Sequence, residues 1–130
     1  MRQINILKYL LIVLLLFTFD CTDSQVKEDQ EISVEELTIR MNSNDSLLIL
    51  DVRTEAELVG PLGQIDGVVN IPIDELEQRI NELDKYKEYD IAVICRSGRR
   101  SERGTSILNE NGFNAKNVVG GMQEYRKMGY

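Results

Sequence analysis

The chain has 130 residues, of which 15 are basic and 22 acidic, and a formal net charge of −7 at pH 7. This length suits one small domain, and the acidic balance argues against nucleic acid as a partner. The chain has no histidine, which excludes Ser-His and Cys-His catalytic pairs and any metal site built from imidazole. We therefore expect neither a metal nor a cofactor.

The first segment, residues 1–21, has Arg2 and Lys8 at its start and a nearly apolar run over 9–19. A positively charged start with a short apolar centre is typical of an export signal. Cys21 ends the segment, which resembles a bacterial lipoprotein signal, where the cysteine is lipidated and becomes the mature N-terminus. We expect an exported protein, periplasmic or on the cell surface, anchored to a membrane through Cys21. An ordinary signal, or an uncleaved anchor, is the alternative.

A polar tether and then the folded domain are expected after this segment. Residues 22–31, TDSQVKEDQE, contain a single apolar residue in ten and cannot pack a core. The domain is expected over 32–130. It opens with Ser33 and Glu36 at the spacing of a capping box, which predicts a helix over about 34–42.

Strands and helices alternate along the rest of the domain. We expect strands near 47–52, 68–72, 91–95 and 117–121, a loop with one helical turn over 55–67, and helices near 73–85, 100–111 and 122–130. Two of the strand runs are apolar without alternation, as in a parallel sheet that is covered on both faces. The predicted fold class is α/β, a central parallel sheet with helices on both faces.

The loop after the third expected strand carries the strongest chemical signal. The stretch AVICRSGRRS, residues 92–101, ends an apolar run on Cys95 and places three arginines around one glycine. Like charges at this spacing repel, so they must lie in solvent or meet something negative. Ligands of open α/β sheets bind beyond the carboxyl ends of the strands, which is where Cys95 lies.

Three features of this loop favour a thiolate on Cys95. A helix begins just after it and presents free N–H groups, Gly98 lets the loop curl into an anion-binding nest, and the arginines add positive charge. Such settings lower a cysteine pKa to between about 3.5 and 7.5, which predicts a nucleophile that needs no base. The alternative is a buried, inert Cys95 in the core, followed by a charged turn.

Three blocks of the domain resemble rhodanese-domain sulfurtransferases. The loop CRSGRRS is similar to the active-site loop of the family. Residues 50–72, LDVRTEAELVGPLGQIDGVVNIP, are similar to its first signature, and residues 117–130, NVVGGMQEYRKMGY, to its closing segment. The blocks follow in the family's order over nearly the whole domain, so the chain is identified as a single-domain rhodanese-like sulfurtransferase.

The resemblance implies that Cys95 takes sulfane sulfur from a small anionic donor such as thiosulfate and passes it, as a persulfide, to a thiol or cyanide. Asp51 and Arg53 fall on the family's DVR pair, and we interpret them as an internal ion pair that supports the loops. The residues implied in substrate binding are Arg96, Ser97, Gly98, Arg99, Arg100 and Ser101.

Two other functions remain open. A persulfide carrier or binding module without turnover would have the same loop. Cysteine phosphatases and arsenate reductases place an arginine after cysteine and five residues, but that position here is Ser101. The arginine at 100 closes a six-residue loop, which suits a single sulfur atom better than a phosphate.

Overall fold

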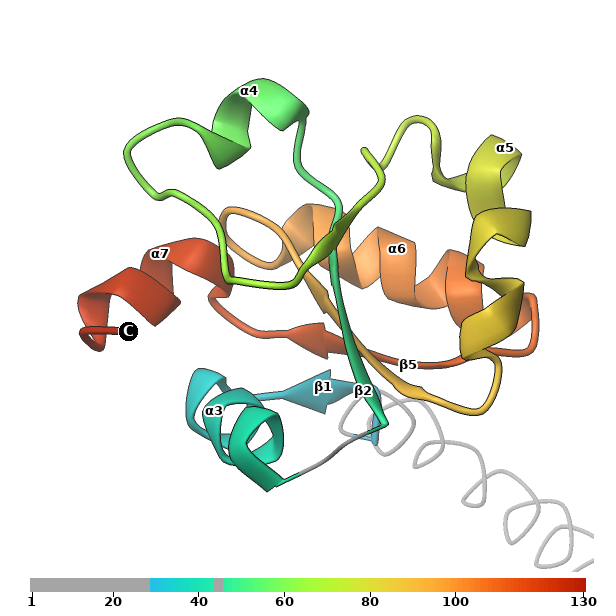
Figure 1. Cartoon of the computed structure of the whole chain (residues 1–130), viewed down its shortest axis with the longest axis horizontal. Helices are drawn as coiled ribbons and strands as arrows, with labels where there is room; N and C mark the ends of the chain where they lie inside the picture. The colour runs from blue at the N-terminus through green and yellow to red at the C-terminus, as the bar shows by residue number, and fades with distance from the viewer. Residues whose placement is uncertain (1–28, 44–45) are drawn as a thin grey trace, which may run out of the picture.

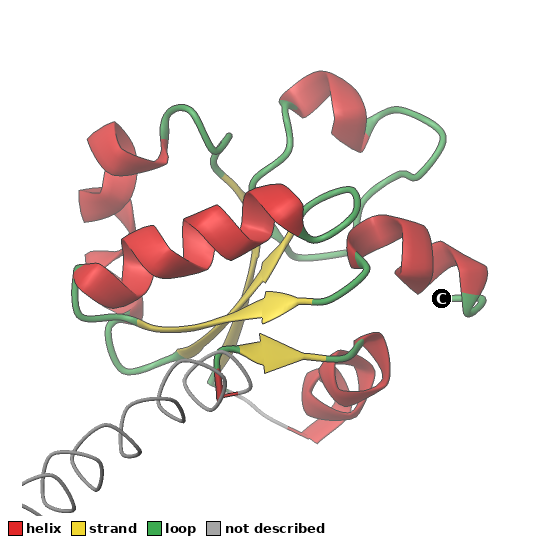
Figure 2. Cartoon of the chain, turned by 180° about the vertical axis from the view of Figure 1, so that it is seen from behind, coloured by secondary structure: helices red, strands yellow, loops and turns green. Residues whose placement is uncertain are grey.

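Five parallel strands form one sheet in the computed structural model, which describes residues 29–43 and 46–130. The strand order is β1-β5-β4-β2-β3, and every neighbouring pair is parallel (Figures 1 and 2). The strands are β1 (Glu31–Ile32), β2 (Leu47–Asp51), β3 (Val69–Asn70), β4 (Asp90–Ile94) and β5 (Asn114–Val118). The helices are α3 (Val34–Ser43), α4 (Glu55–Leu58), α5 (Leu76–Arg79), the 3-10 helix η1 (Ile80–Tyr86), α6 (Arg99–Glu110) and α7 (Gly121–Lys127).

Helices cover both faces of the sheet, as the apolar strand runs predicted. Successive strand residues point to opposite faces, so Leu48 and Leu50 of β2 join one core and Ile49 joins the other. Helices α5, η1 and α6 complete the first core, and α3 and α7 the second (Figure 2). The helix residues buried there are Leu76, Leu83, Ile107 and Leu108 on one side and Val34, Leu37, Met122 and Tyr125 on the other.

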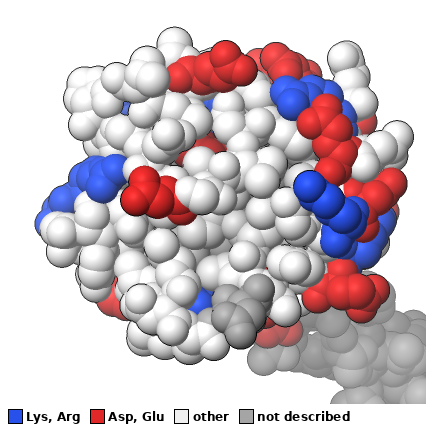
Figure 3. All heavy atoms as spheres, in the orientation of Figure 1, with Lys and Arg blue, Asp and Glu red and all other residues white. Residues whose placement is uncertain are grey.

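The single helix expected over 73–85 is instead two pieces. Its start was predicted too early, because the backbone N–H of Ile73 donates to the carbonyl of Val52 at 3.0 Å and so continues the sheet. The helix then begins at Leu76 as α5, and from Ile80 the chain winds as the 3-10 helix η1. Arg79 of these helices pairs with Glu75 and Glu82, and Figure 3 shows basic and acidic side chains side by side there, on the right.

The sheet has an edge strand that was not predicted. Glu31 and Ile32 form β1 and pair with Asn117 and Val118. The expected tether, 22–31, therefore overlaps the sheet at its last residue. The last expected strand, 117–121, was also placed too late: β5 begins at Asn114, where it pairs with Asp90 of β4.

The export segment 1–21, with the expected lipidation at Cys21, lies outside the described residues, as does most of the tether. Among the residues that the structure does describe, none of the helices combines the length and apolarity needed to cross a bilayer.

Candidate active site

The loops after β2 and β4 begin at the same edge of the sheet. These two strands are paired in parallel, with Asp51 opposite Ile94, so the chain leaves both of them in the same direction. Cys95 follows β4 directly. In Figure 1, the segment around α4, the loop before α6 and the start of α7 gather at this end of the sheet. The site therefore has a rigid base in two central strands and walls from three loops.

Hydrogen-bond donors converge on the sulfur of Cys95. The backbone N–H of Gly98 lies 3.1 Å from Sγ, and the Oγ of Ser101 lies 3.3 Å from it. Gly98 has a φ of +103°, a conformation that favours glycine, and it directs its N–H back toward the strand end. A loop with these inward donors is a nest for a negatively charged sulfur.

The pKa of Cys95 lies below its ordinary value. Burial by itself would raise this pKa, since a low-dielectric setting disfavours the thiolate. The hydroxyl of Ser101 and the backbone N–H groups of Ser101, Gly98 and Ser97 outweigh that effect, because they donate to the charged form. The net shift favours a thiolate, the form in which cysteine is a nucleophile.

Cys95 is nonetheless buried, with 1% of its surface exposed, and it packs in the core beneath α6. Both expectations from the sequence are therefore met in part: the residue is buried like a core cysteine, and its sulfur accepts hydrogen bonds like a thiolate.

The start of α7 fixes the loop from behind. The N–H of Met122 donates to the carbonyl of Cys95 at 2.8 Å, and the N–H of Gln123 donates to that of Arg96 at 3.0 Å. Gly121 makes this approach possible: a Cβ on it would overlap the carbonyl oxygen of Cys95 and lie 2.8 Å from the carbonyl carbon of Arg96. With both carbonyls held toward α7, the loop is free to turn N–H groups toward the sulfur.

The hydroxyl of Ser101 connects the sulfur to β5. Its Oγ lies 2.7 Å from Oδ1 of Asn117 and 3.0 Å from the carbonyl of Gly98, besides the 3.3 Å to Sγ. A hydroxyl has one proton and donates to one acceptor at a time. Asn117 is 5% exposed, so this side chain competes with the sulfur for that proton in a buried setting.

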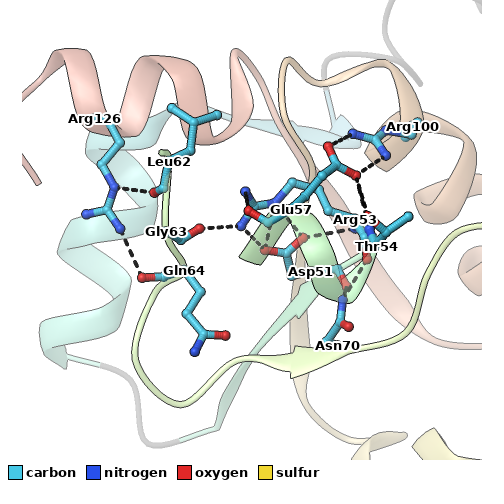
Figure 4. Close-up of polar contacts among 10 residues, drawn as sticks. All are labelled: Asp51, Arg53, Thr54, Glu57, Leu62, Gly63, Gln64, Asn70, Arg100 and Arg126. Atoms are coloured by element: carbon cyan, nitrogen blue, oxygen red, sulfur yellow. Dashed lines mark hydrogen bonds and ion pairs between the residues drawn. The ribbon is translucent and has the colours of Figure 1, made fainter. Parts of the chain in front are cut away.

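The three arginines of the loop have different surroundings. Arg96 and Arg99 are exposed, whereas Arg100 is half-buried and paired with Glu57 of α4. Two hydrogen bonds join that pair, at 2.8 Å and 2.7 Å (Figure 4). A carboxylate from a distant segment thus already meets the charge of Arg100, and the binding of a substrate anion by these three arginines stays a prediction.

Two hollows adjoin the loop, and Arg96 contributes to both. The first, of about 510 Å³, is lined mainly by the arginines Arg96, Arg99, Arg100 and Arg103. The second, of about 480 Å³, is more apolar, and its lining includes Ala56, Pro61 and Leu62 together with Glu57 and Gln123. The loop thus opens onto a basic hollow on one side and a largely apolar hollow on the other.

The wall of the apolar hollow is supported by two arginines. Arg53 is 1% exposed, pairs with the fully buried Asp51 at 2.7 Å, and donates to the carbonyl of Gly63 at 2.7 Å (Figure 4). The internal ion pair expected from the sequence is present. Arg126 of α7 donates to the carbonyls of Leu62 at 2.7 Å and Gln64 at 3.0 Å.

This combination of fold and loop defines an α/β domain with a cysteine sulfur that accepts hydrogen bonds from its loop at the end of a central strand. The model of the rhodanese-like domain matches residues 33–128. The chain belongs to the rhodanese-like domain family.

Two relatives from Bacillus subtilis support this assignment. The chain is 44% identical over 96 residues to a Bacillus subtilis protein named "Putative sulfur carrier protein YrkF", covering 73% of this chain and 50% of the relative. It is 37% identical over 98 residues to "Putative sulfurtransferase YtwF" of the same organism, covering 75% and 91%. The chain thus spans about half the length of YrkF and nearly all of YtwF.

Solved structures show the same fold. A rhodanese-related protein from Thermoplasma volcanium matches with a TM-score of 0.70 and 33% identity over 78% of this chain and 94% of that one. A rhodanese-like domain protein from Staphylococcus aureus matches with a TM-score of 0.67 and 30% identity over 74% and 90%. The α/β fold expected from the sequence is confirmed as rhodanese-like.

Sequence reasoning missed several residues that shape the site, chiefly Glu57, Asn117 and Gly121. Each reaches the loop from another element. Glu57 lies 43 residues from its partner Arg100, and Asn117 lies 16 residues from its partner Ser101. Only Gly121 left a signal, as the second glycine of a Gly-Gly pair after an apolar strand. The described residues contain no group of three or more side chains suited to a metal ion.

Proposed function

We propose that the protein is a sulfurtransferase that carries sulfane sulfur on Cys95. The observation that carries this proposal is the set of donors around Sγ: the hydroxyl of Ser101 and the N–H groups of Ser101, Gly98 and Ser97. They favour the thiolate, and the same donors would stabilise a second, negatively charged sulfur bound to it. Membership of the rhodanese-like family supports this chemistry.

The reaction proceeds in two displacements. The Cys95 thiolate attacks the outer sulfur of thiosulfate; an S–S bond forms to Cys95 as the bond to the sulfonate sulfur breaks, and sulfite leaves with the electron pair. A thiolate or cyanide then attacks the outer sulfur of the persulfide, and Cys95 departs as a thiolate. Each step conserves electrons without an external oxidant, and the kinetics are ping-pong. Arg96, Arg99 and Arg103 in the basic hollow favour an anionic donor.

Thiocyanate formation from thiosulfate and cyanide tests the proposal. We expect turnover by the wild type and none by Cys95→Ser, and a mass gain of one sulfur atom on Cys95 after thiosulfate alone. An aryl phosphate, offered in parallel, should not be hydrolysed, because Arg100 is engaged by Glu57 and position 101 is serine. Sulfur transfer that persists in Cys95→Ser, or phosphate release without thiocyanate, contradicts the proposal.

A sulfur carrier without turnover is the second candidate. Two observations favour it: a relative with 44% identity is named as a sulfur carrier, and only 1% of Cys95 is exposed. A carrier would form the persulfide and keep it when small thiols or cyanide are added, releasing it only to a partner protein. The rate at which the persulfide mass decays in added glutathione separates the two.

We also propose that the protein is exported and membrane-anchored through a lipid on Cys21. The support is the charged and apolar pattern of residues 1–21 alone. The mass of the N-terminal peptide from purified protein tests it: a peptide that begins at an acylated Cys21 is expected, and one that begins at Met1 contradicts it.

A further inference from the structure

The ion pair between Glu57 and Arg100 lies between the two hollows beside the Cys95 loop. Arg100 lines the basic hollow and Glu57 the apolar one. The two side chains join through both nitrogens of the guanidinium and both carboxylate oxygens, at 2.8 Å and 2.7 Å. This fork-to-fork geometry is also how arginine binds an oxyanion such as sulfate or phosphate. Glu57 therefore occupies the donors that an oxyanion would use.

Glu57 is held in place independently of Arg100. Its Oε2 accepts hydrogen bonds from the backbone N–H of Thr54 at 3.1 Å and from the Thr54 hydroxyl at 3.2 Å (Figure 4). The hydrogen bond from Arg100 is the largest factor that lowers the pKa of Glu57, to about 2, so the carboxylate is charged throughout the neutral range. An anion that approaches Arg100 must displace a fixed, ionised carboxylate.

Among the described residues, the other arginines of the basic hollow have weaker ionic partners than Arg100 or none. Arg103 lies 3.7 Å from Asp74, an exposed and loose pair, while Arg96 and Arg99 are exposed. These three provide a diffuse positive field that attracts anions. They do not reproduce the paired donors of Arg100. The hollow is thus suited to attract an anion without holding it tightly.

We propose that Glu57 is a specificity-determining residue that withholds Arg100 from substrate anions. This inference rests on the proposed sulfurtransferase function. By occupying the paired donors, Glu57 keeps tetrahedral oxyanions such as sulfate and phosphate from binding firmly beside Cys95, and it lets the sulfite product depart. The same contact disfavours phosphate-ester chemistry on a loop that otherwise combines a cysteine nucleophile with clustered arginines.

Glu57→Gln tests the charge alone. Glutamine keeps an oxygen that accepts from Thr54 or Arg100, but it no longer neutralises the guanidinium. We expect inhibition of the thiosulfate–cyanide reaction by sulfate and phosphate to strengthen about tenfold, the effect of one charge-assisted hydrogen bond. The matched control is Glu82→Gln, which removes a carboxylate bound to Arg79 at 2.8 Å on η1; inhibition should not change. An unchanged inhibition constant in Glu57→Gln overturns the proposal.

A second readout does not depend on sulfur transfer. Iodoacetate and iodoacetamide alkylate the same thiolate and differ in charge, so the ratio of their rates at Cys95 reports the local field and cancels changes in the thiolate fraction. Following the Cys95 peptide by mass spectrometry, we expect Glu57→Gln to raise this ratio several-fold and Glu82→Gln to leave it unchanged. An unchanged ratio in Glu57→Gln overturns the inference even where the wild type transfers sulfur. A wild type without transfer contradicts only the proposed function.

The double variant Glu57→Gln with Arg100→Gln distinguishes the effect of an uncompensated Arg100 charge from a folding defect caused by the change at position 57. It removes both charges, so the rate ratio and the oxyanion inhibition should return close to the wild-type values. If the single variant fails to fold, Arg100→Gln alone gives the converse test: Glu57 then stands unpaired, and the ratio should fall below that of the wild type. A ratio that rises in Arg100→Gln contradicts the proposal.

Discussion

Two loops start side by side at the carboxyl ends of β2 and β4, and they use polar groups in opposite ways. After β2, Asp51 and Arg53 satisfy each other, and Arg53 also holds the carbonyl of Gly63. After β4, the loop directs N–H groups and a hydroxyl at the Cys95 sulfur. The polar groups of the first loop satisfy one another within that loop. The second loop directs its donors at a sulfur that they would stabilise in its negatively charged form.

The role of each arginine in these loops depends on which carboxylate can reach it. Arg53 has Asp51 two residues away and is buried as part of the framework. Arg100 finds Glu57, which the chain brings from 43 positions earlier. Arg96 and Arg99 remain in solvent. Within one site, arginine thus supports a loop at position 53, is neutralised by a carboxylate at position 100, and provides positive charge at the surface at positions 96 and 99.

Breaking the buried ion pair should have the largest effect. Arg53→Met leaves the fully buried Asp51 carboxylate without its partner, and we expect a loss of about 3–5 kcal/mol in the free energy of unfolding by urea. Arg99→Met, which removes an exposed arginine, should stay within about 0.5 kcal/mol of the wild type. Equal losses in the two variants would contradict the division of roles between the loops.

A side chain on Gly121 should separate the loop from its support. Gly121→Ala places a Cβ against the carbonyl of Cys95 at a φ of +57°, and we expect a loss of about 2–4 kcal/mol and of most activity. Gly67→Ala is the matched control, with a φ of +77° and open space around it. It carries only the backbone strain, about 1–2 kcal/mol, and should keep its activity. Full activity in Gly121→Ala would show that the loop does not need this contact.

Removing one donor to the sulfur should be a smaller change in stability, about 1 kcal/mol. Ser101→Ala deletes the hydroxyl that does most to lower the pKa of Cys95, so this pKa should rise and the pH profile of iodoacetamide alkylation should move to higher pH. Ser106→Ala removes an exposed hydroxyl from the same helix and should leave the profile in place. If the pH profile of alkylation is the same in Ser101→Ala as in the wild type, the backbone N–H groups alone lower the pKa of Cys95.

The smallest expected effect is the pH dependence that Cys95 adds to stability. Its pKa is lower in the folded protein than its ordinary value, so folding favours the thiolate. The resulting stabilisation is fully present above the pKa of the unfolded thiol and is lost as the pH falls through the folded pKa. The difference in unfolding free energy between wild type and Cys95→Ser should therefore grow as the pH rises from 6 to about 9. A difference that shrinks over this range would mean that the pocket disfavours the thiolate.

Local patterns determined most of the framework. Continuous apolar runs predicted β2 and β4, and the capping spacing from Ser33 predicted α3. The position of Cys95 directly after a strand was predicted in the same way, and its role as a nucleophile stays a prediction. These signals lie within a few residues of one another, so periodicity and spacing can detect them. The two-residue strand β1 has no such pattern, because its pairing with β5 comes from contact across the sheet.

Tertiary contact alone decided how the site is charged. The sequence by itself placed three arginines next to a cysteine, but it could not show that Glu57 meets one of them or that Gly121 lets α7 hold the loop. Nor could it show that Asn117 shares the Ser101 proton with the sulfur. A hydrogen bond or ion pair depends on positions within a few ångströms, and the chain's order along the sequence does not specify those positions until the sheet brings its strand ends together.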